Sequence, residues 1–260
     1  MSKTTGIEWT DKTWNPWHGC TKVSPGCAHC YMYRDKGRYG QEPEVVTRSK
    51  TTFNDPLKWH EPARVFTCSW SDFFHEAADG WRDEAWNIIR RTPHLTYQIL
   101  TKRPERIAAH LPADWGEGWP NVWLGVSVEN QRWRERMGRL ALIPAAVRFV
   151  SCEPLLGPVS FKWLLTEPPP IALTTADESH ALDFFRETFD WVIVGGESGP
   201  DARPMELDWA RTIRDECAEA GVAFFLKQLG GYPDARAHDK AVLDGRRHTA
   251  MPNNQTTERR

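Results

Sequence analysis

Short apolar segments of β type recur along the chain, and a loop and then a helical pattern follow each of them. This alternation predicts a parallel sheet, because parallel strands need a crossover connection that is usually a helix. Six or seven such units in one run predict an α/β fold with a complete or partial (β/α) barrel, with a doubly wound open sheet as the alternative. The expected strands are Arg64–Ser69, Leu95–Thr101, Asn121–Ser127, Val147–Cys152, Trp191–Gly195 and Val222–Leu226, with a weaker one at Gly6–Thr10.

Two of the intervening helices are indicated by apolar residues at helical spacing. Trp133, Met137 and Leu140 share one face of the first helix. The second helix is expected to end at Gly221, because glycine commonly stops a helix at its carboxyl end. Its apolar face is made by Leu207, Ala210, Ile213 and Cys217.

We expect a single barrel-like domain over residues 1–231, with the cysteine loop 20–30 near its start. The segment Thr166–His180 carries three consecutive prolines and is expected to be an elaborated loop. Residues 232–260 are expected to form a loosely structured tail, because their last twenty or so residues lack an apolar period.

Composition excludes several classes of protein. Of the 260 residues, 40% are hydrophobic and 26% are charged, which excludes a disordered, collagen-like or coiled-coil chain. Apolar runs fall far short of the roughly 20 residues that cross a bilayer, and the N-terminus is unlike a signal peptide. We therefore expect a cytoplasmic protein with no membrane partner. A formal charge of −2 leaves only a local basic patch to attract nucleic acid, and the 14 tryptophans indicate core packing or surfaces that stack bases.

The most specific motif is a cluster of three cysteines near the N-terminus. Cys20, Cys27 and Cys30 have the spacing C-x6-C-x2-C, and a Pro-Gly pair before the second cysteine indicates a tight loop. Clustered cysteines in a cytosolic chain are more often metal ligands than disulfides. Three interpretations are open: a [4Fe–4S] cluster with one iron left open for a ligand, a zinc ion completed by His18 or His29, and three unliganded core thiols.

Polar residues follow the expected strands, where the active site of a (β/α) barrel lies. A rim that carries both carboxylates and cations fits a zwitterionic ligand, although a single residue of this kind is as readily a helix cap. These residues are Ser69, Ser71, Asp72, Lys102, Arg103, Ser127, Glu129, Asn130, Ser151, Glu153, Glu197, Ser198, Lys227 and Gln228.

Seven ordered blocks between Thr5 and Gly231 have a further meaning when they are taken together. The blocks are Thr5–Cys20, the cysteine loop, Gln98–Pro104, Gly125–Glu129, Ser151–Gly157, Gly195–Pro200 with Ala202–Pro204, and Phe225–Gln228. In this order they resemble the phage Gp37/Gp68 family, a domain-of-unknown-function family also called the three-Cys-motif proteins.

This resemblance implies a radical S-adenosylmethionine (SAM) enzyme with a partial barrel, distantly similar to spore photoproduct lyase. On the resemblance, Cys20, Cys27 and Cys30 match the ligands of a [4Fe–4S] cluster, and His29 takes the place of a planar residue near the adenine. SAM bound to the open iron would be cleaved after one-electron reduction, and the 5′-deoxyadenosyl radical would abstract hydrogen from a substrate. The cysteine spacing differs from the common C-x3-C-x2-C, and Cys68–Asp72 stands where many radical SAM proteins have Gly-Gly-Glu.

Strand-end position adds further candidates. Cys68 and Cys152 are candidates for returning hydrogen to a product radical, with small core residues as the alternative. The candidates for binding SAM are Ser69, Asp72, Lys102, Ser127, Glu129, Glu153 and Glu197.

Two functions from different classes compete. The first is a radical SAM lyase-type enzyme that acts on DNA or a modified base, for which a reducing electron donor and a three-Cys-motif partner protein are the expected protein partners. Basic residues that would contact DNA are Lys102, Arg103, Arg106, Arg132, Arg134, Arg136 and Arg139, with a solvated helix face as the alternative for the last four. The second function is a zinc-stabilised, non-enzymatic binding or adaptor protein of phage origin.

Overall fold

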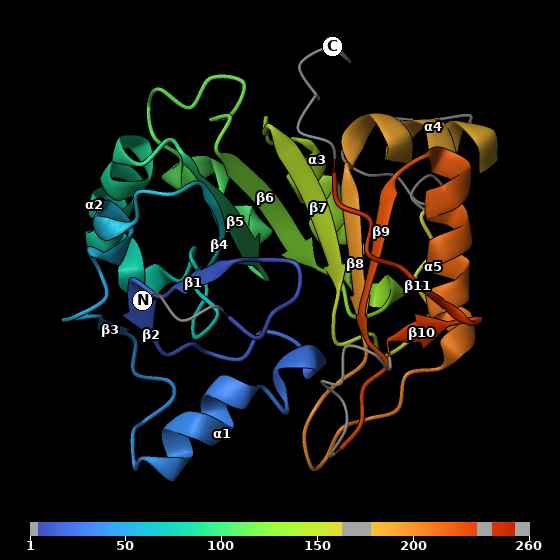
Figure 1. The fold of residues 1–260 in the computed structure, drawn as a ribbon, viewed down its shortest axis with the longest axis horizontal. Helices are drawn as coiled ribbons and strands as arrows, with labels where there is room; N and C mark the ends of the chain where they lie inside the picture. The colour runs from blue at the N-terminus through green and yellow to red at the C-terminus, as the bar shows by residue number, and fades with distance from the viewer. Residues whose placement is uncertain (1–4, 163–177, 233–240, 253–260) are drawn as a thin grey trace. The chain divides into compact units, whose positions relative to one another are not determined.

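The structure, a computed structural model, describes residues 5–162, 178–232 and 241–252 (Figure 1). Within these residues the main sheet has seven strands in the order β1-β4-β5-β6-β7-β8-β9. The pairs β1–β4, β4–β5, β7–β8 and β8–β9 are parallel. Strands that follow one another in chain order, with no reversal, are typical of a (β/α) barrel, whereas a doubly wound sheet has a switch point. The α/β prediction is therefore confirmed, and the strand order fits a partial barrel.

The chain divides into two compact units, and β6 contributes to both. The first unit comprises Met1–Gly125 and Ile143–Ala146. Its elements are β1 (Lys12–Trp14), β2 (Trp17–His18), η1 (Pro25–Cys27), α1 (Tyr31–Arg38), β3 (Thr47–Arg48), η2 (Asp55–Lys58), β4 (Ala63–Thr67), η3 (Glu76–Ala78), α2 (Asp79–Arg91), β5 (Leu95–Thr101), η4 (Pro104–Arg106), η5 (Ala108–His110) and most of β6 (Val122–Ser127).

The second unit comprises Val126–Leu142 and Val147–Arg260. Here α5 packs against β9 and α4, and α3 packs against β7. Its elements are the end of β6, η6 (Gln131–Trp133), α3 (Glu135–Ala141), β7 (Val147–Cys152), α4 (Glu178–Thr188), β8 (Trp191–Gly195), α5 (Leu207–Ala220), β9 (Ala223–Gln228), β10 (Val242–Leu243) and β11 (Arg246–Arg247).

Tryptophans fill much of the core of the first unit. Trp14 and Trp17 are completely buried, and their indole N–H groups donate to the backbone oxygens of Phe53 at 3.0 Å and of Asp72 at 3.1 Å. A buried indole gains apolar area and needs only one acceptor, so both residues are satisfied core side chains. This bears out core packing, rather than base stacking, for these two tryptophans.

Two expectations about the ends of the chain are wrong. The first strand lies at Lys12–Trp14 rather than Gly6–Thr10, because the Thr10 N–H closes a turn onto the Ile7 oxygen at 3.3 Å. Residues 241–252 are not loosely structured: β10 and β11 pair as an antiparallel hairpin that buries Leu243. The remainder of the expected tail beyond residue 232, and most of the Thr166–His180 loop, lie outside the described residues.

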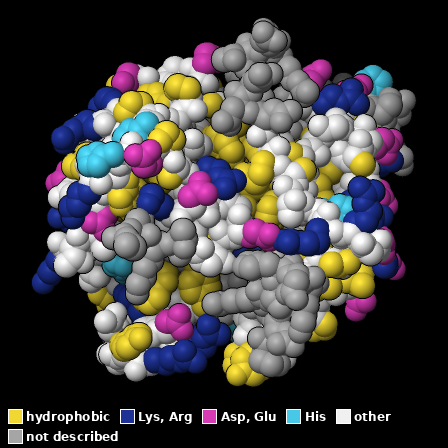
Figure 2. All heavy atoms as spheres, in the orientation of Figure 1, with side chains coloured by type: hydrophobic (Ala, Val, Ile, Leu, Met, Phe, Trp, Pro, Cys, Tyr) yellow, Lys and Arg dark blue, Asp and Glu magenta, His cyan; other side chains and the backbone are white. Residues whose placement is uncertain are grey.

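The outer surface shows no single dominant charge on the face drawn in Figure 2, where basic and acidic side chains are interspersed. This agrees with the near-neutral charge of the chain. No helix in the described part of the chain has both the length and the apolar character of a membrane-spanning segment.

Candidate metal centre

The cysteine motif lies on a loop of the first unit that several backbone contacts hold in place. Cys20 follows β2, Cys27 ends η1 and Cys30 caps the N-terminus of α1; all three are free thiols and partly exposed. The Cys20 N–H donates to the Pro43 oxygen at 3.0 Å. Just before it, Gly19 has a φ of 101°, and a Cβ there would press on the backbone of Val45. Glycine at this position therefore lets the loop pass close to residues 43–45.

Two tyrosines of α1 fasten the helix to neighbouring loops. The Tyr33 hydroxyl donates to the Cys20 backbone oxygen at 2.5 Å, and the Tyr31 hydroxyl donates to the Ser69 oxygen. The Ser69 hydroxyl itself faces Asn15, whose Nδ2 donates to it at 2.9 Å. The segment after β4 thus braces the cysteine loop, and both hydroxyl and carbonyl of Ser69 have protein partners.

Arg103, directly after β5, reaches the cysteine loop from a buried position. Its Nη1 lies 3.6 Å from Cys20 Sγ and 3.3 Å from Asp72 Oδ2. Its Nη2 donates to Thr21 Oγ1 at 2.7 Å and to the Thr21 backbone oxygen at 3.0 Å. The remaining nitrogen, Nε, lies 3.6 Å from Glu76 Oε2. All three nitrogens of the guanidinium therefore face acceptors, and a burial of this kind removes Arg103 from the residues that could contact a DNA backbone.

Asp72 is the anchor of this arrangement. Its Oδ1 accepts hydrogen bonds from the Phe74 N–H at 2.9 Å and from Thr101 Oγ1 at 2.7 Å. Its Oδ2 accepts from the Lys102 N–H at 3.0 Å and from Arg103. A buried carboxylate is stable only when it is paired and hydrogen-bonded. These four donors give Asp72 the role of holding Arg103 and the end of β5, while its predicted contact with SAM stays a prediction.

Burial favours the protonated form of two thiols of the loop, Cys20 and Cys30. Burial raises the pKa of Cys20 to about 12, the nearby Asp72 carboxylate adds to the rise, and Arg103 opposes it. Burial also raises the pKa of Cys30. The hydrogen bonds that backbone N–H groups of α1 donate to its sulfur oppose this rise. A bound metal cation reverses this balance, because it replaces the proton and neutralises the thiolate.

The donor set fits a thiolate-bound metal, although it is not already assembled. Among the described residues, no three His, Cys, Asp or Glu side chains form a ready-made metal-binding group. Cys27 nevertheless influences the pKa values of both Cys20 and Cys30, so the three sulfurs share one electrostatic neighbourhood. Soft thiolates on one loop suit zinc or an iron–sulfur cluster.

The second unit carries a separate polar rim at the ends of β7, β8 and β9. Glu153, after β7, reaches across the end of β8, and its Oε1 accepts a hydrogen bond from Lys227 Nζ on β9 at 2.6 Å. Gly195 makes this crossing feasible, because a Cβ there would lie 3.2 Å from Glu153 Cδ. The two side chains are 19% and 23% exposed, so solvent reaches this pair.

The other two carboxylates of the rim are buried with arginines. Glu129 is 0% exposed, and its Oε2 lies 3.0 Å from Nη1 of Arg136, which is 3% exposed. Glu197 accepts hydrogen bonds from Arg203 Nη2 at 2.6 Å and from Arg203 Nε at 2.9 Å. Arg136 is therefore buried in an ion pair and, like Arg103, is not exposed for contact with a DNA backbone.

One family model, described as "Protein of unknown function (DUF5131)", matches residues 4–252. The chain belongs to the DUF5131 family. Comparisons with curated proteins and with solved structures gave no match. The family assignment covers both the cysteine loop and the polar rim of this DUF5131 protein, and it carries no activity of its own.

The remaining candidate site residues of the DUF5131 protein differ in the solvent exposure of their side chains. His29 is exposed on the cysteine loop, and Lys102 is partly buried beside Asp72. Ser127 is buried, and its backbone oxygen accepts a hydrogen bond from Arg136 at 2.8 Å. Cys68 and Cys152 are buried, and burial raises the pKa of both thiols, so each keeps its proton. Their predicted roles are untested by these positions.

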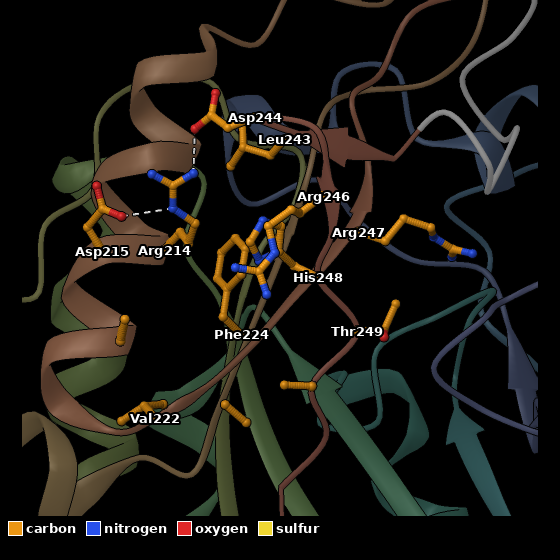
Figure 3. Close-up of a pocket in the computed structure, with 13 residues that line it drawn as sticks. Arg214, Asp215, Val222, Phe224, Leu243, Asp244, Arg246, Arg247, His248 and Thr249 are labelled. Atoms are coloured by element: carbon orange, nitrogen blue, oxygen red, sulfur yellow. Dashed lines mark hydrogen bonds and ion pairs between the residues drawn. The ribbon is translucent and has the colours of Figure 1, made fainter.

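A hollow of about 570 Å³ lies elsewhere in the second unit, among α5, β9 and the β10–β11 hairpin (Figure 3). Asp244, in the hairpin turn, accepts hydrogen bonds from Arg211 Nε at 3.0 Å and from Arg214 Nη1 at 2.5 Å, which fastens the hairpin to α5. None of the candidate site residues lines it. We interpret this hollow as the groove left where the hairpin docks.

Sequence reasoning missed the support around Cys20. Thr21 accepts from Arg103 and also lies 3.1 Å from His75 Nε2. His75 Nδ1 accepts from the Ala77 N–H at 3.1 Å, and His75 Nε2 accepts from the Thr21 N–H at 3.3 Å. Arg103 belongs to the Gln98–Pro104 block and to the expected strand-end residues, but its contact with Thr21, and that of His75, could not be predicted because the partners lie more than fifty positions apart in the chain.

Proposed function

We propose that this protein is a radical SAM enzyme that binds a [4Fe–4S] cluster through Cys20, Cys27 and Cys30 and acts on DNA or a modified base. The observation that carries the proposal is the loop of three free, partly exposed thiols, one of which faces a buried guanidinium. Three thiolates leave one iron of such a cluster open. The resemblance to the phage Gp37/Gp68 and radical SAM proteins, which rests on the motifs of the sequence, supports the same function.

Cys20, Cys27 and Cys30 would hold the cluster, which would supply the electron for reductive cleavage of SAM. The protein's own part would be to present three thiolates, with His29 exposed on the same loop, and to bind the organic ligands. In the second unit, Glu153 and Lys227 form a strand-end pair that solvent reaches and that could bind a charged ligand. Ser127, Glu129 and Glu197 would shape that rim from buried positions.

A nucleic-acid substrate would require basic residues that remain at the surface. Arg132 and Arg139, both exposed, belong to the stretch that contains η6 and α3. In contrast, Arg103 and Arg136 are buried in ion pairs. DNA binding that weakens with salt and with neutralisation of Arg132 and Arg139 supports this substrate class, and its absence at low salt refutes it.

A zinc-stabilised binding or adaptor protein is the second candidate, and His18 favours it. Burial lowers the pKa of His18, with the nearby Lys36 ammonium adding to the effect. His18 is therefore neutral at physiological pH, which is the form that binds zinc. In this case three thiolates and one imidazole would close a tetrahedral site and leave no open position.

The deciding experiment is an anaerobic purification followed by iron, sulfide and zinc assays and a visible spectrum, with and without SAM. We expect the iron and sulfide of one cluster per chain, a spectrum that SAM perturbs, and loss of both in Cys27→Ala. The matched control is Cys217→Ala, which removes a buried thiol of α5 and should leave the iron in place. One zinc per chain, no colour and indifference to SAM would refute the enzyme and support the adaptor.

A further inference from the structure

The guanidinium of Arg103 contacts the cysteine loop through both of its terminal nitrogens. An arginine fork presents five N–H donors in a fixed plane. Here one edge faces Cys20 Sγ and the Asp72 carboxylate, and the other holds both oxygens of Thr21, the residue next to Cys20. A single side chain thus fixes the backbone after the first cysteine and places a positive charge beside its sulfur.

Two carboxylates near Arg103 reduce the positive potential that its guanidinium produces at Cys20 Sγ. Asp72 shares Nη1 with Cys20 Sγ, so its negative charge partly offsets that of the guanidinium. Glu76 lies at the third nitrogen of Arg103 with a half-exposed side chain, where water screens its charge. The net field at Cys20 Sγ therefore depends on the Arg103–Asp72 pair, both members of which are buried.

We propose that Arg103 is a positioning residue that holds Cys20 in place and raises the reduction potential of the cluster bound there, and that Asp72 limits this rise. The inference depends on the proposed function, because it requires a [4Fe–4S] cluster on the loop. An N–H group that donates to a ligand sulfur, and a nearby positive charge, both favour the more negative, reduced cluster. A carboxylate beside the same sulfur disfavours it.

The test is a redox titration of the anaerobically purified full-length protein, followed by electron paramagnetic resonance, with dithionite as the electron donor. The variants are Arg103→Gln, Arg103→Lys and Asp72→Asn. Arg106→Gln is the control, because Arg106 donates to Asp79 and to the Phe74 oxygen and contacts no cysteine in the described residues. Iron content, circular dichroism and melting temperature are measured for each protein.

We expect opposite shifts from the two members of the pair. Arg103→Gln should lower the midpoint potential by at least a tenfold change in the one-electron equilibrium constant, which corresponds to about 59 mV. Asp72→Asn should raise the potential, and Arg106→Gln should leave it unchanged. Arg103→Lys should fall between wild type and Arg103→Gln, because an ammonium keeps the charge and loses the fork that holds Thr21.

The outcomes separate this inference from the proposed function. If wild-type protein holds no iron, the proposed function fails and the inference fails with it. If Arg103→Gln is folded and holds iron at an unchanged potential, the inference is overturned while the cluster stands. Shifts of the same sign in Arg103→Gln and Asp72→Asn also overturn it. Iron lost from folded Arg103→Gln and kept by Arg103→Lys supports the holding role.

Discussion

Removing Arg136 should deprive the buried carboxylate of Glu129 of an arginine that pairs with it inside the protein. Glu129 and Arg136 are 0% and 3% exposed, and their side-chain atoms approach to 3.0 Å. Nη1 of Arg136 also donates to the Ser127 oxygen at 2.8 Å, and the guanidinium lies 4.2 Å from the centre of the Trp133 ring. All three contacts disappear in Arg136→Met, which keeps most of the side-chain volume.

The expected cost follows from the burial of this pair. Breaking a buried ion pair by removing one partner costs about 3–5 kcal/mol, because the remaining charge loses its ion-pair partner. For a chain of this size that corresponds to a fall in melting temperature of roughly 6–20 °C. Replacing both partners, in Glu129→Leu with Arg136→Met, should recover most of the loss, because an apolar pair of similar volume is often no worse than a buried ion pair.

The assay is urea unfolding of wild type, both single variants and the double variant, analysed as a double-mutant cycle. Lys58→Met is the control, because Lys58 pairs with Asp55 at the surface with side chains 69% and 30% exposed. An exposed pair contributes about 0–1 kcal/mol. A cost for Arg136→Met as small as that of the control would refute the reasoning, since it would mean that water or another charge compensates Glu129.

Two further predictions concern other parts of the second unit. Gly196→Ala should destabilise the protein by about 1–3 kcal/mol in urea unfolding, because its Cβ would lie 2.7 Å from the backbone carbon of Leu229. Gly138→Ala, in α3 with open space around the new Cβ, should instead stabilise it by about 0.5–1 kcal/mol; equal signs for both would contradict this. Hydrogen bonds from Arg211 and Arg214 lower the pKa of Asp244 to about 2 from 3.8, so the stabilisation is present above about pH 4 and is lost as the pH falls through 2. Wild type and Asp244→Asn should therefore differ in melting temperature at neutral pH and have similar melting temperatures at acid pH. A difference that stays constant with pH would contradict a stabilising role for the hydrogen bonds from Arg211 and Arg214 to Asp244.

The central strands could be predicted because each is marked by an apolar run within its own short segment of the sequence. Leu95–Thr101, Val147–Cys152 and Trp191–Gly195 were expected from apolar runs between turn signals, and the structure has the same bounds. A strand buried on both faces needs such a run, whatever its neighbours. The end of α5 was equally local, since Gly221 adopts a φ of 72° that glycine allows without strain.

The short elements could not be predicted in this way. β10 and β11 have two residues each, and Arg246–Arg247 has no apolar pattern that would indicate a strand. What forms them is tertiary: the Leu226 N–H donates to the His248 oxygen at 2.8 Å, so the chain adds to the edge of β9. A two-residue strand has too few side chains to carry a period, and its stability comes from the edge that it covers.

The candidate site likewise has a part that one short segment of sequence reveals and a part that depends on contacts between distant segments. The spacing of Cys20, Cys27 and Cys30 identifies the loop without any structure, because the three residues lie within one short segment. The contact between Arg103 and Cys20 spans 83 positions, and nothing near Arg103 in the sequence announces it. The sequence therefore offers Arg103 only as a strand-end residue and candidate DNA contact, and Arg136 only as a DNA contact or part of a solvated helix face.

Burial also sorts the strand-end carboxylates of the second unit, which look equivalent in the sequence. Glu129 and Glu197 are buried, and each is matched by an arginine that donates to it. Displacing Arg136, which is 3% exposed, would leave a guanidinium away from solvent, which is costly, whereas Arg203 is 33% exposed. Glu153 differs, because water reaches both its side chain and that of Lys227. When a ligand separates this pair, water solvates whichever charge is released, so an exchange of partners costs less at Glu153 than at the buried Glu129–Arg136 pair.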